Sequence, residues 1–180
     1  MLSFDEARAR LLDAARKVKG VDRVPLADGL GRVLAESIRS TLDVPPLDNS
    51  GMDGYAVRCA DVPAAGTALR VAQRIPAGSV GHALEPGTAA RIFTGAPVPP
   101  GADAVVMQEL CEHGGHGQVI VNHVPQPEDN IRRAGEDIRK DAEVLAAGPL
   151  LTPAAIGMAA SVGVAQLPVM RCLSVAVLST

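Results

Sequence analysis

Short apolar segments separated by glycine and proline fill the middle of this chain, from about residue 52 to residue 123. Alternating apolar and polar residues between turn-forming residues are typical of strands. Strands this short and this closely spaced favour a small β-barrel or sandwich. The clearest of these segments are residues 68–75, 89–93, 104–109 and 118–122.

A glycine-rich turn at residues 112–117 joins the last two segments. Its histidines, His113 and His116, could together hold a metal ion, but a hairpin tip exposed to solvent explains the glycines better. We therefore assign these two histidines no catalytic role.

The flanks of this region carry helix signals. Ser3 and Glu6 have the spacing of a capping box, and apolar residues then recur at helical spacing, so a first helix is expected to end near Gly20. Further along, Thr152 and Pro153 have the form of a helix cap followed by a first helical residue.

Two more strands are expected near the end of the sequence, at residues 164–169 and 173–178. The second is rich in apolar residues, as in a strand buried on both faces of a sheet. Such a strand ordinarily passes through a loop into a helix, yet the sequence stops at Thr180. This pattern indicates a chain that is cut within a further domain.

Composition predicts a globular protein and argues against several functions. Hydrophobic residues make up 47% of 180 residues, enough for a proper core. The net charge of −3, without a basic run, argues against nucleic acid or an anionic membrane as the main partner, and no Trp is present for base stacking.

Three widely spaced cysteines without a CxxC pair predict neither a disulfide framework nor a zinc site. With no leader and no membrane span in the sequence, we expect a cytoplasmic protein.

The densest group of polar and turn-forming residues is the stretch 45–57. Side chains at positions 48–50 can hydrogen-bond nearby backbone, and the two glycines of the stretch permit close approaches that a Cβ would obstruct. Asp53 lies between those glycines. The stretch predicts a functional site, although the polar residues that lead into an ordinary hairpin would be similar.

Two later stretches add further chemistry. Thr94 and Gly95 lie in a loop whose groups could donate to an oxyanion, but the loop has no Lys and is not a Walker P-loop. Arg132 could clamp an anion or form a structural ion pair. If the loops converge, hard carboxylate oxygens favour Mg²⁺ shared with substrate phosphates. The candidate carboxylates are Asp53, Glu136 and Asp137.

Together, the three stretches resemble the molybdenum insertase family, also called molybdopterin molybdenumtransferase, whose relatives include the E domain of gephyrin. The matching motifs are, in order, PPLDNSGMDGYAV, IFTGAPVPPGADAVV and NIRRAGEDI, and the resemblance covers essentially the whole chain. Gly51 stands where many relatives carry Ala, a change that we expect to alter local flexibility more than chemistry.

The resemblance implies an α+β fold, with an extended α/β first domain that carries an inserted β-barrel-like domain. On this basis residues 1–45 and 126–172 form the discontinuous first domain and residues 46–125 form the inserted domain. Residues 173–180 would be the first strand of a truncated, nucleotide-fold-like domain, so the chain is expected to be an N-terminal portion.

The resemblance also implies a function, the insertion of molybdate into adenylylated molybdopterin with release of AMP and help from Mg²⁺. It assigns catalytic roles to Asp53, Thr94 and Asp137. Because the family assembles its site across a homodimer, this chain is expected to supply about half of a site and to be inactive alone. The candidate substrate contacts are Asn49, Ser50, Gly95 and Arg132, and the candidate Mg²⁺ ligands are Asp53 and Glu136.

Three alternatives remain open at this stage. Asn49 and Ser50 could shape their loop without touching substrate. The chain could be a non-catalytic dimerisation or scaffold module, which would not require the three catalytic residues. It could also be a stand-alone Mg²⁺-dependent phosphohydrolase, which would need a complete site within these 180 residues.

Overall fold

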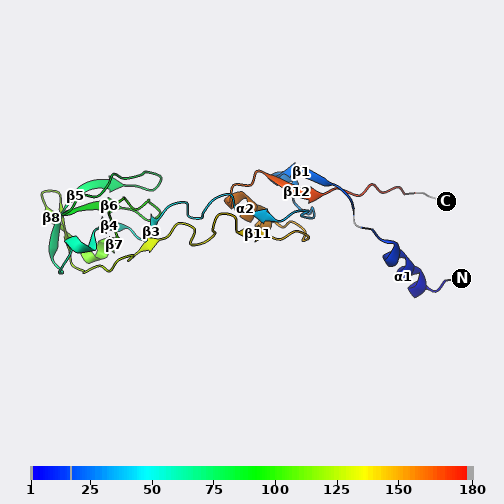
Figure 1. Cartoon of the computed structure of the whole chain (residues 1–180), viewed down its shortest axis with the longest axis horizontal. Coiled ribbons are helices and arrows are strands. Elements are labelled where there is room, and N and C mark those ends of the chain that lie inside the picture. Colours follow the sequence, from blue (N-terminus) through cyan, green and yellow to red (C-terminus); the bar gives the residue numbers. More distant parts are fainter. Residues whose placement is uncertain (1, 17, 178–180) are drawn as a thin grey trace. The chain divides into compact units, whose positions relative to one another are not determined.

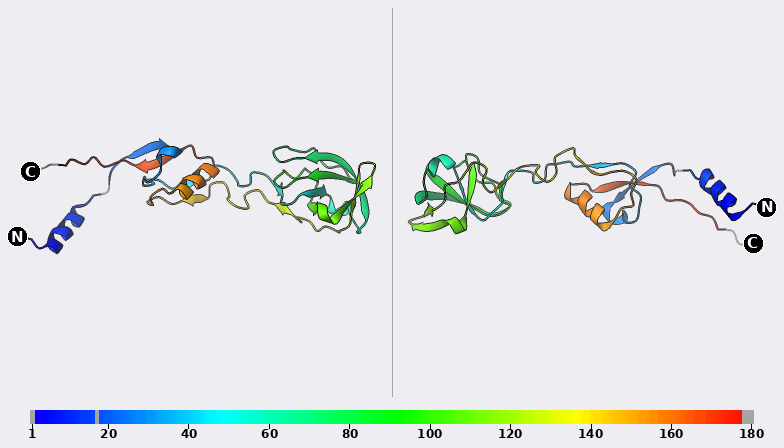
Figure 2. Two further views of the ribbon diagram at one scale, coloured as in Figure 1. Left: turned by 180° about the vertical axis from the view of Figure 1, so that it is seen from behind. Right: turned by 90° about the horizontal axis from the view of Figure 1, so that it is seen from below.

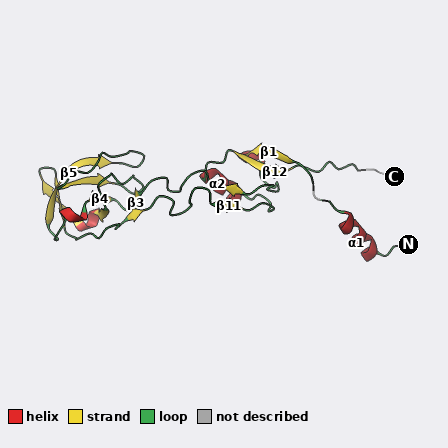
Figure 3. Cartoon of the chain, in the orientation of Figure 1, coloured by secondary structure: helices red, strands yellow, loops and turns green. Residues whose placement is uncertain are grey.

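A computed structural model describes residues 2–16 and 18–177, and it contains few helices and many short strands (Figures 1 and 3). These residues form two compact units. One unit consists of the described residues up to Ser40 and from Glu143 onward, and the other is Thr41–Ala142. The second unit is therefore inserted within the first, and Figure 2 shows each of them from two further sides.

A six-stranded sheet forms the framework of the inserted unit. Its strand order is β7-β4-β6-β5-β9-β8, and neighbouring strands are antiparallel except for the parallel pair β5 and β6. The four segments that alternation predicted as strands are confirmed as β5, β6, β7 and β9. The bounds are β4 Gly54–Val57, β5 Thr67–Ile75, β6 Thr88–Ile92, β7 Ala104–Met107, β8 Cys111–Gly115 and β9 Gln118–Val121.

The two edge strands, β7 and β8, are joined only by the short 3-10 helix η3 (Gln108–Leu110). In a flat sheet with strands about 4.8 Å apart, these edges would be separated by about 24 Å. The connecting residues can reach only about 14 Å. The sheet must therefore curl, which is the form that a barrel-like domain requires.

Apolar side chains pack on both faces of this sheet, and β4 is buried along its whole length. Alternation along β4 directs Tyr55 and Val57 to one core and Ala56 to the other. A second 3-10 helix, η2 (Cys59–Asp61), follows β4. The first core cluster includes Tyr55, Val57, Leu69, Ala89, Val106, Val119 and Val121, and the second includes Ala56, Ile75, Leu84, Ala90, Ile92 and Val105.

The other unit contains two short antiparallel strand pairs. β1 (Val21–Pro25) pairs with β12 (Gln166–Met170), and β2 (Ile38–Arg39) pairs with β11 (Glu143–Leu145). The 3-10 helix η1 (Leu26–Asp28) follows β1 directly. The buried apolar side chains of this unit include Leu34, Leu151, Ala159, Val162, Leu167 and Val169.

Both α-helices begin with the caps that the sequence predicts. The capping box of Ser3 and Glu6 opens α1 (Phe4–Ala14), which ends before the predicted stop and buries none of its residues. The side chain of Thr152 caps α2 (Pro153–Ser161). Within residues 2–16 and 18–177, no helix combines the length and the apolar character that a membrane span needs.

The predicted strand at residues 173–178 is not formed in the described part of that segment. Residues 171–177 belong to no strand, and Leu173, Val175 and Val177 are 73%, 78% and 89% exposed. A strand is stabilised by hydrogen bonds to a neighbouring strand. The part of the chain that the structure describes places no strand beside this segment. Residues 178–180 of the prediction lie outside the described residues.

The inserted unit extends to Ala142, beyond the end predicted at residue 125. Two contacts explain the difference. The strand β10 (Ile131–Arg132) pairs with β3 (Asn49–Ser50), and the guanidinium of Arg133 pairs with the carboxylate of Asp48. These contacts attach the third motif to the same unit as the first.

Candidate functional site

The first and second motifs meet because of the register between β4 and β6. These strands are antiparallel with Gly54 opposite Ile92, so Asp53, just before β4, lies beside the loop that follows β6. The backbone N–H and the hydroxyl of Thr94 both donate to Oδ1 of Asp53, each at 2.8 Å. Two of the three predicted catalytic residues are therefore in direct contact.

This contact favours the ionised form of Asp53. The backbone N–H of Thr94, then its hydroxyl, and to a smaller extent the positive charge of Arg91 lower the pKa of the Asp53 carboxyl. Asp53 is therefore ionised at neutral pH. Among residues 2–16 and 18–177, no group donates a hydrogen bond to its second oxygen, Oδ2, and the side chain is partly exposed. The site thus presents one oriented, uncommitted carboxylate oxygen.

Replacing Thr94 with Val is expected to raise the pKa of Asp53 part of the way toward its ordinary value, because the backbone N–H remains as the larger cause of the shift. Since the folded-state pKa lies below the unfolded one, the contact stabilises the fold above the unfolded pKa, and this contribution is lost as pH falls through the folded pKa. An NMR titration of the Asp53 carboxyl measures the change.

The control for this titration is Thr94→Ser, which keeps the hydroxyl and is expected to titrate as the unmodified protein does. If the Val variant titrated in the same way as the Ser variant, the hydroxyl would have no part in lowering the pKa of Asp53.

Ser50 and Gly95 hold the Thr94 loop against the first motif. The N–H of Gly95 donates to the Ser50 carbonyl at 2.8 Å, and the N–H of Ser50 donates to the Ala96 carbonyl at 2.9 Å. Gly95 has a φ of 80°, in the region that favours glycine. The Ser50 side chain is buried and hydrogen-bonds the backbone of Met52. These two predicted substrate contacts are therefore engaged in shaping the loops.

The third motif joins the same loops through β10 and β3. Their pairing sets Arg132 opposite Asn49 and Ile131 opposite Ser50. The partly exposed Asn49 thus lies beside an exposed guanidinium, and all the predicted site residues belong to the inserted unit.

Arg132 is held by the carboxylates of its own motif. Its Nη2 lies 2.6 Å from Oδ1 of Asp137, and its Nε lies 3.4 Å from Oε1 of Glu136. The other Glu136 oxygen accepts the Arg133 N–H at 3.0 Å. The structure therefore contains the ion pair that the sequence offered as the alternative to an anion clamp.

Asp48 connects the first and third motifs. Its Oδ1 accepts the Ala134 N–H at 2.8 Å, and its Oδ2 pairs with the guanidinium of Arg133, which also contacts Glu128. The Ala134 N–H in first place, and Arg133 after it, lower the pKa of Asp48. An ionised Asp48 therefore fastens the third motif to the loop that carries Asn49.

Arg91 and Gln108 also adjoin Asp53, and neither was predicted from the sequence as a site residue. Arg91 Nη1 donates to the Gly54 carbonyl at 2.8 Å, and Nη2 donates to Oε1 of Gln108 at 2.6 Å. The N–H of Gln108 donates to the Asp53 carbonyl at 3.0 Å. The signal that could have found Arg91 is a lone positive charge inside the apolar segment 89–93.

Of the two predicted Mg²⁺ ligands, Asp53 fits the metal better. Its Oδ2 is uncommitted, whereas both Glu136 oxygens already contact Arg132 or Arg133. In the described ranges, 2–16 and 18–177, no group of three or more His, Cys, Asp or Glu could hold a metal. One carboxylate is still compatible with Mg²⁺ that binds mainly through substrate phosphates.

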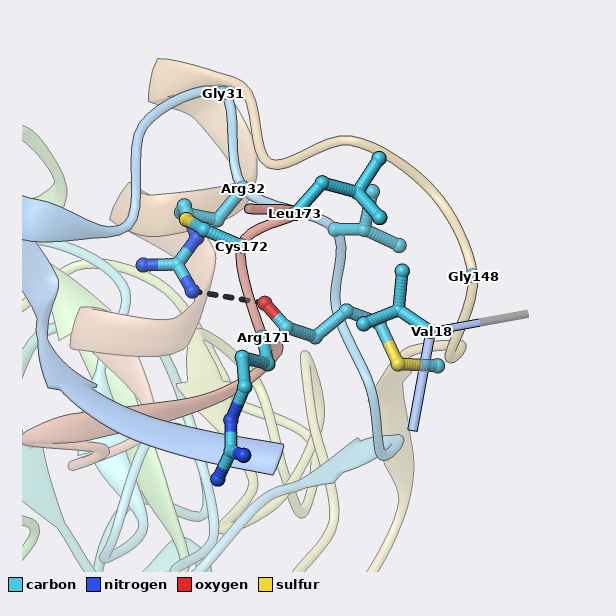
Figure 4. Close-up of a pocket in the computed structure, with 9 residues that line it drawn as sticks. Val18, Gly31, Arg32, Gly148, Arg171, Cys172 and Leu173 are labelled. Atoms are coloured by element: carbon cyan, nitrogen blue, oxygen red, sulfur yellow. Dashed lines mark hydrogen bonds between the residues drawn. The ribbon is translucent and has the colours of Figure 1, made fainter. Parts of the chain in front are cut away.

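A cavity in the other unit contains none of the predicted site residues (Figure 4). Its volume is about 540 Å³, and Arg32 Nη2 donates to the Met170 carbonyl at its wall, at 2.8 Å. No carboxylate or imidazole lines it. None of the predicted carboxylates therefore contributes to this cavity.

Comparison with known proteins agrees with the three motifs. A family model described as "MoeA N-terminal region (domain I and II)" matches residues 2–163. The chain belongs to this MoeA N-terminal family. The molybdopterin molybdenumtransferase of Haemophilus influenzae is 41% identical over 181 aligned positions, which cover 100% of this chain and 45% of the relative. Molybdopterin molybdenumtransferase 2 of Mycobacterium tuberculosis is 42% identical over 177 positions, which cover 96% of this chain and 42% of the relative.

A solved structure shows the same fold. The crystal structure of a molybdopterin biosynthesis moeA protein from Pyrococcus horikoshii OT3 aligns with a TM-score of 0.83 at 36% identity, covering 94% of this chain and 46% of that chain. This similarity supports the α+β fold class. The chain spans less than half the length of these relatives.

Proposed function

We propose that this chain acts in molybdenum cofactor biosynthesis, where it contributes part of a site that inserts molybdate into adenylylated molybdopterin and releases AMP. The observation that carries the proposal is the contact between Asp53 and Thr94, which joins two motif loops around one oriented carboxylate. The names of the relatives, molybdopterin molybdenumtransferases, support it.

In this proposal Asp53 is the group that faces the substrate. Thr94 uses both of its donors on Asp53, so its role is to orient that carboxylate rather than to donate to molybdate. A Mg²⁺ held through Oδ2 of Asp53 would neutralise charge on the substrate phosphates. Asp137, the third proposed catalytic residue, is fixed by Arg132 and would act together with that ion pair.

We also propose that groups outside this chain complete the site. The chain covers 45% of the Haemophilus influenzae relative, so more than half of that relative has no counterpart here. In a homodimer, the missing groups would come from further domains of a second subunit that face the sheet of the first.

The test is AMP release from adenylylated molybdopterin in the presence of molybdate and Mg²⁺. The chain is assayed alone and with the remaining part of the Haemophilus influenzae relative, supplied as a separate polypeptide. We expect no release by the chain alone and release by the mixture. Robust release by the chain alone would show a complete site within 180 residues. If the two parts bind each other but the mixture releases no AMP, the scaffold function is favoured.

A further inference from the structure

Arg74 and Arg91 lie side by side on one face of the six-stranded sheet. In the parallel pair β5 and β6, Arg74 is opposite Arg91, and in the antiparallel pair β4 and β6, Tyr55 is opposite Arg91. The three side chains therefore form one row across three neighbouring strands. This row continues the face that carries the first core cluster, to which Tyr55 belongs.

A β-bulge puts Arg74 in this row. Before the bulge, Leu69 and Val71 pack against the same core cluster as Tyr55. The register then shifts between Val71 and Gln73, and after the shift Ile75 packs in the opposite cluster. Uninterrupted alternation would have placed Arg74 on the opposite face. Bulges commonly redirect a side chain next to a functional site.

Neither guanidinium forms an ion pair with a carboxylate in the described residues. Within residues 2–16 and 18–177, neither Arg74 nor Arg91 takes part in an ion pair. Like charges directly opposite each other on neighbouring strands are destabilising. By contrast, Arg70, earlier on β5, pairs with Glu85 at 3.8 Å. The described residues therefore keep two adjacent positive charges outside any ion pair, although the charge of Arg91 also acts on Asp53.

Aromatic rings hold these arginines in place. The guanidinium carbon of Arg74 lies 4.8 Å from the centre of the Phe93 ring, and that of Arg91 lies 4.5 Å from Phe93 and 5.3 Å from Tyr55. These are cation–π distances. A guanidinium stacked on a ring keeps the N–H groups at its edge available for contact with an anion. Arg91 already uses one N–H of Nη1 and one of Nη2 on Gly54 and Gln108, so it would bind an anion through its remaining N–H groups.

A cavity of about 470 Å³ opens beside this row. It is lined by both arginines and Tyr55, together with His113 of β8 and His116 from the turn between β8 and β9, and no carboxylate lines it. A smaller cavity of about 220 Å³ shares Tyr55, Arg91 and His113 and also contains Glu112, whose Oε1 accepts a hydrogen bond from Asn122 at 2.8 Å. The larger cavity thus combines space with donors and positive charge.

We propose that Arg74 and Arg91 form a binding site for a tetrahedral oxyanion, either a free dianion such as phosphate or molybdate, or the phosphate group of a nucleotide-like substrate. Both arginines can donate charge-assisted hydrogen bonds to such an anion. The site adjoins the proposed catalytic carboxylate, because Arg91 donates to the carbonyl of Gly54, the residue after Asp53. Oxyanion binding at this site does not depend on the proposed function. The choice between a free dianion and the phosphate of a substrate rests on the proposed function.

The experiment is a calorimetric titration of the whole chain with inorganic phosphate at low ionic strength. Arg74→Gln is expected to weaken phosphate binding about tenfold or more, since a hydrogen bond to a charged group is lost. Arg70→Gln is the matched control, because Arg70 lies on the same strand and the opposite face, and it is expected to bind as the unmodified chain does. Arg91→Gln is a second test, accompanied by circular dichroism because Arg91 also holds Gly54 and Gln108.

Melting temperature gives an independent measurement. Phosphate is expected to raise the melting temperature of the unmodified chain and of Arg70→Gln, but not that of Arg74→Gln, since a ligand stabilises only the fold that binds it. Equal phosphate affinity in the Arg74→Gln and unmodified chains, or equal losses in the Arg70→Gln and Arg74→Gln variants, would overturn the proposal.

Titrations with molybdate and with AMP distinguish the two sources. Binding of molybdate and phosphate with no preference for AMP identifies a site for the free oxyanion. Tighter binding of AMP, lost in Arg74→Gln, identifies a site for a substrate phosphate. Absence of binding for all three anions would contradict the site, yet it would leave the AMP-release assay of the proposed function unaffected.

Discussion

Replacing Asp53 with Asn is expected to lower AMP release by the chain and its complement on the order of 10²-fold, the usual effect of removing one electrostatic group from a catalytic site. The substitution keeps the size of the side chain, and an amide oxygen can still accept both hydrogen bonds of Thr94. It removes the negative charge of Oδ2, so the Mg²⁺ concentration needed for half-maximal release is expected to rise. Initial rates measured over a range of Mg²⁺ concentrations provide both values.

The matched control for Asp53 is Glu85→Gln. Glu85 is an exposed carboxylate of the same unit, and its ion pair with Arg70 spans 3.8 Å. Its substitution is expected to leave both the rate and the Mg²⁺ requirement unchanged. A rate for Asp53→Asn within a factor of about two of the control would remove Asp53 from the mechanism, since one charge in a catalytic site has a far larger effect.

Features encoded within a few residues were predicted well. The caps Ser3 and Thr152 were found because each is a side chain that accepts an N–H three residues away. The strands β5, β6, β7 and β9 were found because alternation and turn residues are both visible in a short window. The motif residues Asp53 and Thr94 were also singled out from the sequence, and the structure brings them into contact.

Features that depend on register could not be predicted. Thr94 donates both of its hydrogen bonds to Asp53 because Gly54 pairs with Ile92, a residue far from it in the sequence. The row of Arg74 and Arg91 depends on a β-bulge, and an alternation pattern does not predict where a bulge occurs. The position of the third motif depends on the contact between Asp48 and Arg133, which are 85 residues apart.

The absence of the predicted strand from residues 173–177 has a related physical cause. Apolar β-branched residues are enriched in strands, but a strand exists only when another strand accepts and donates its hydrogen bonds. The described part of this segment has no such neighbour, so Val175 and Val177 are exposed. Propensity is a local property, whereas pairing is decided by the rest of the molecule.

Replacing Gly54 with Ala is expected to destabilise the inserted unit by about 3 kcal/mol, the upper part of the usual range for overpacking. A Cβ at this position would lie 2.0 Å from the carbonyl oxygen of Val106 and 3.1 Å from the Cα of Met107. Both atoms are backbone of β7, which pairs with β4, so no side chain can move aside and the strands must separate. For a unit of about 100 residues, the melting temperature should fall by about 12–20 °C.

The same substitution three residues earlier is the control. A Cβ at Gly51 would have the Asn130 carbonyl oxygen as its nearest neighbour, at 3.3 Å, which requires a shift of only a few tenths of an ångström. Gly51→Ala also restricts the unfolded chain, so its net effect should stay within about 1 kcal/mol. Equal melting temperatures for the two variants would mean that β4 and β7 can separate at little cost. That result would also weaken the placement of Asp53, because the Gln108 N–H that donates to the Asp53 carbonyl follows directly after β7.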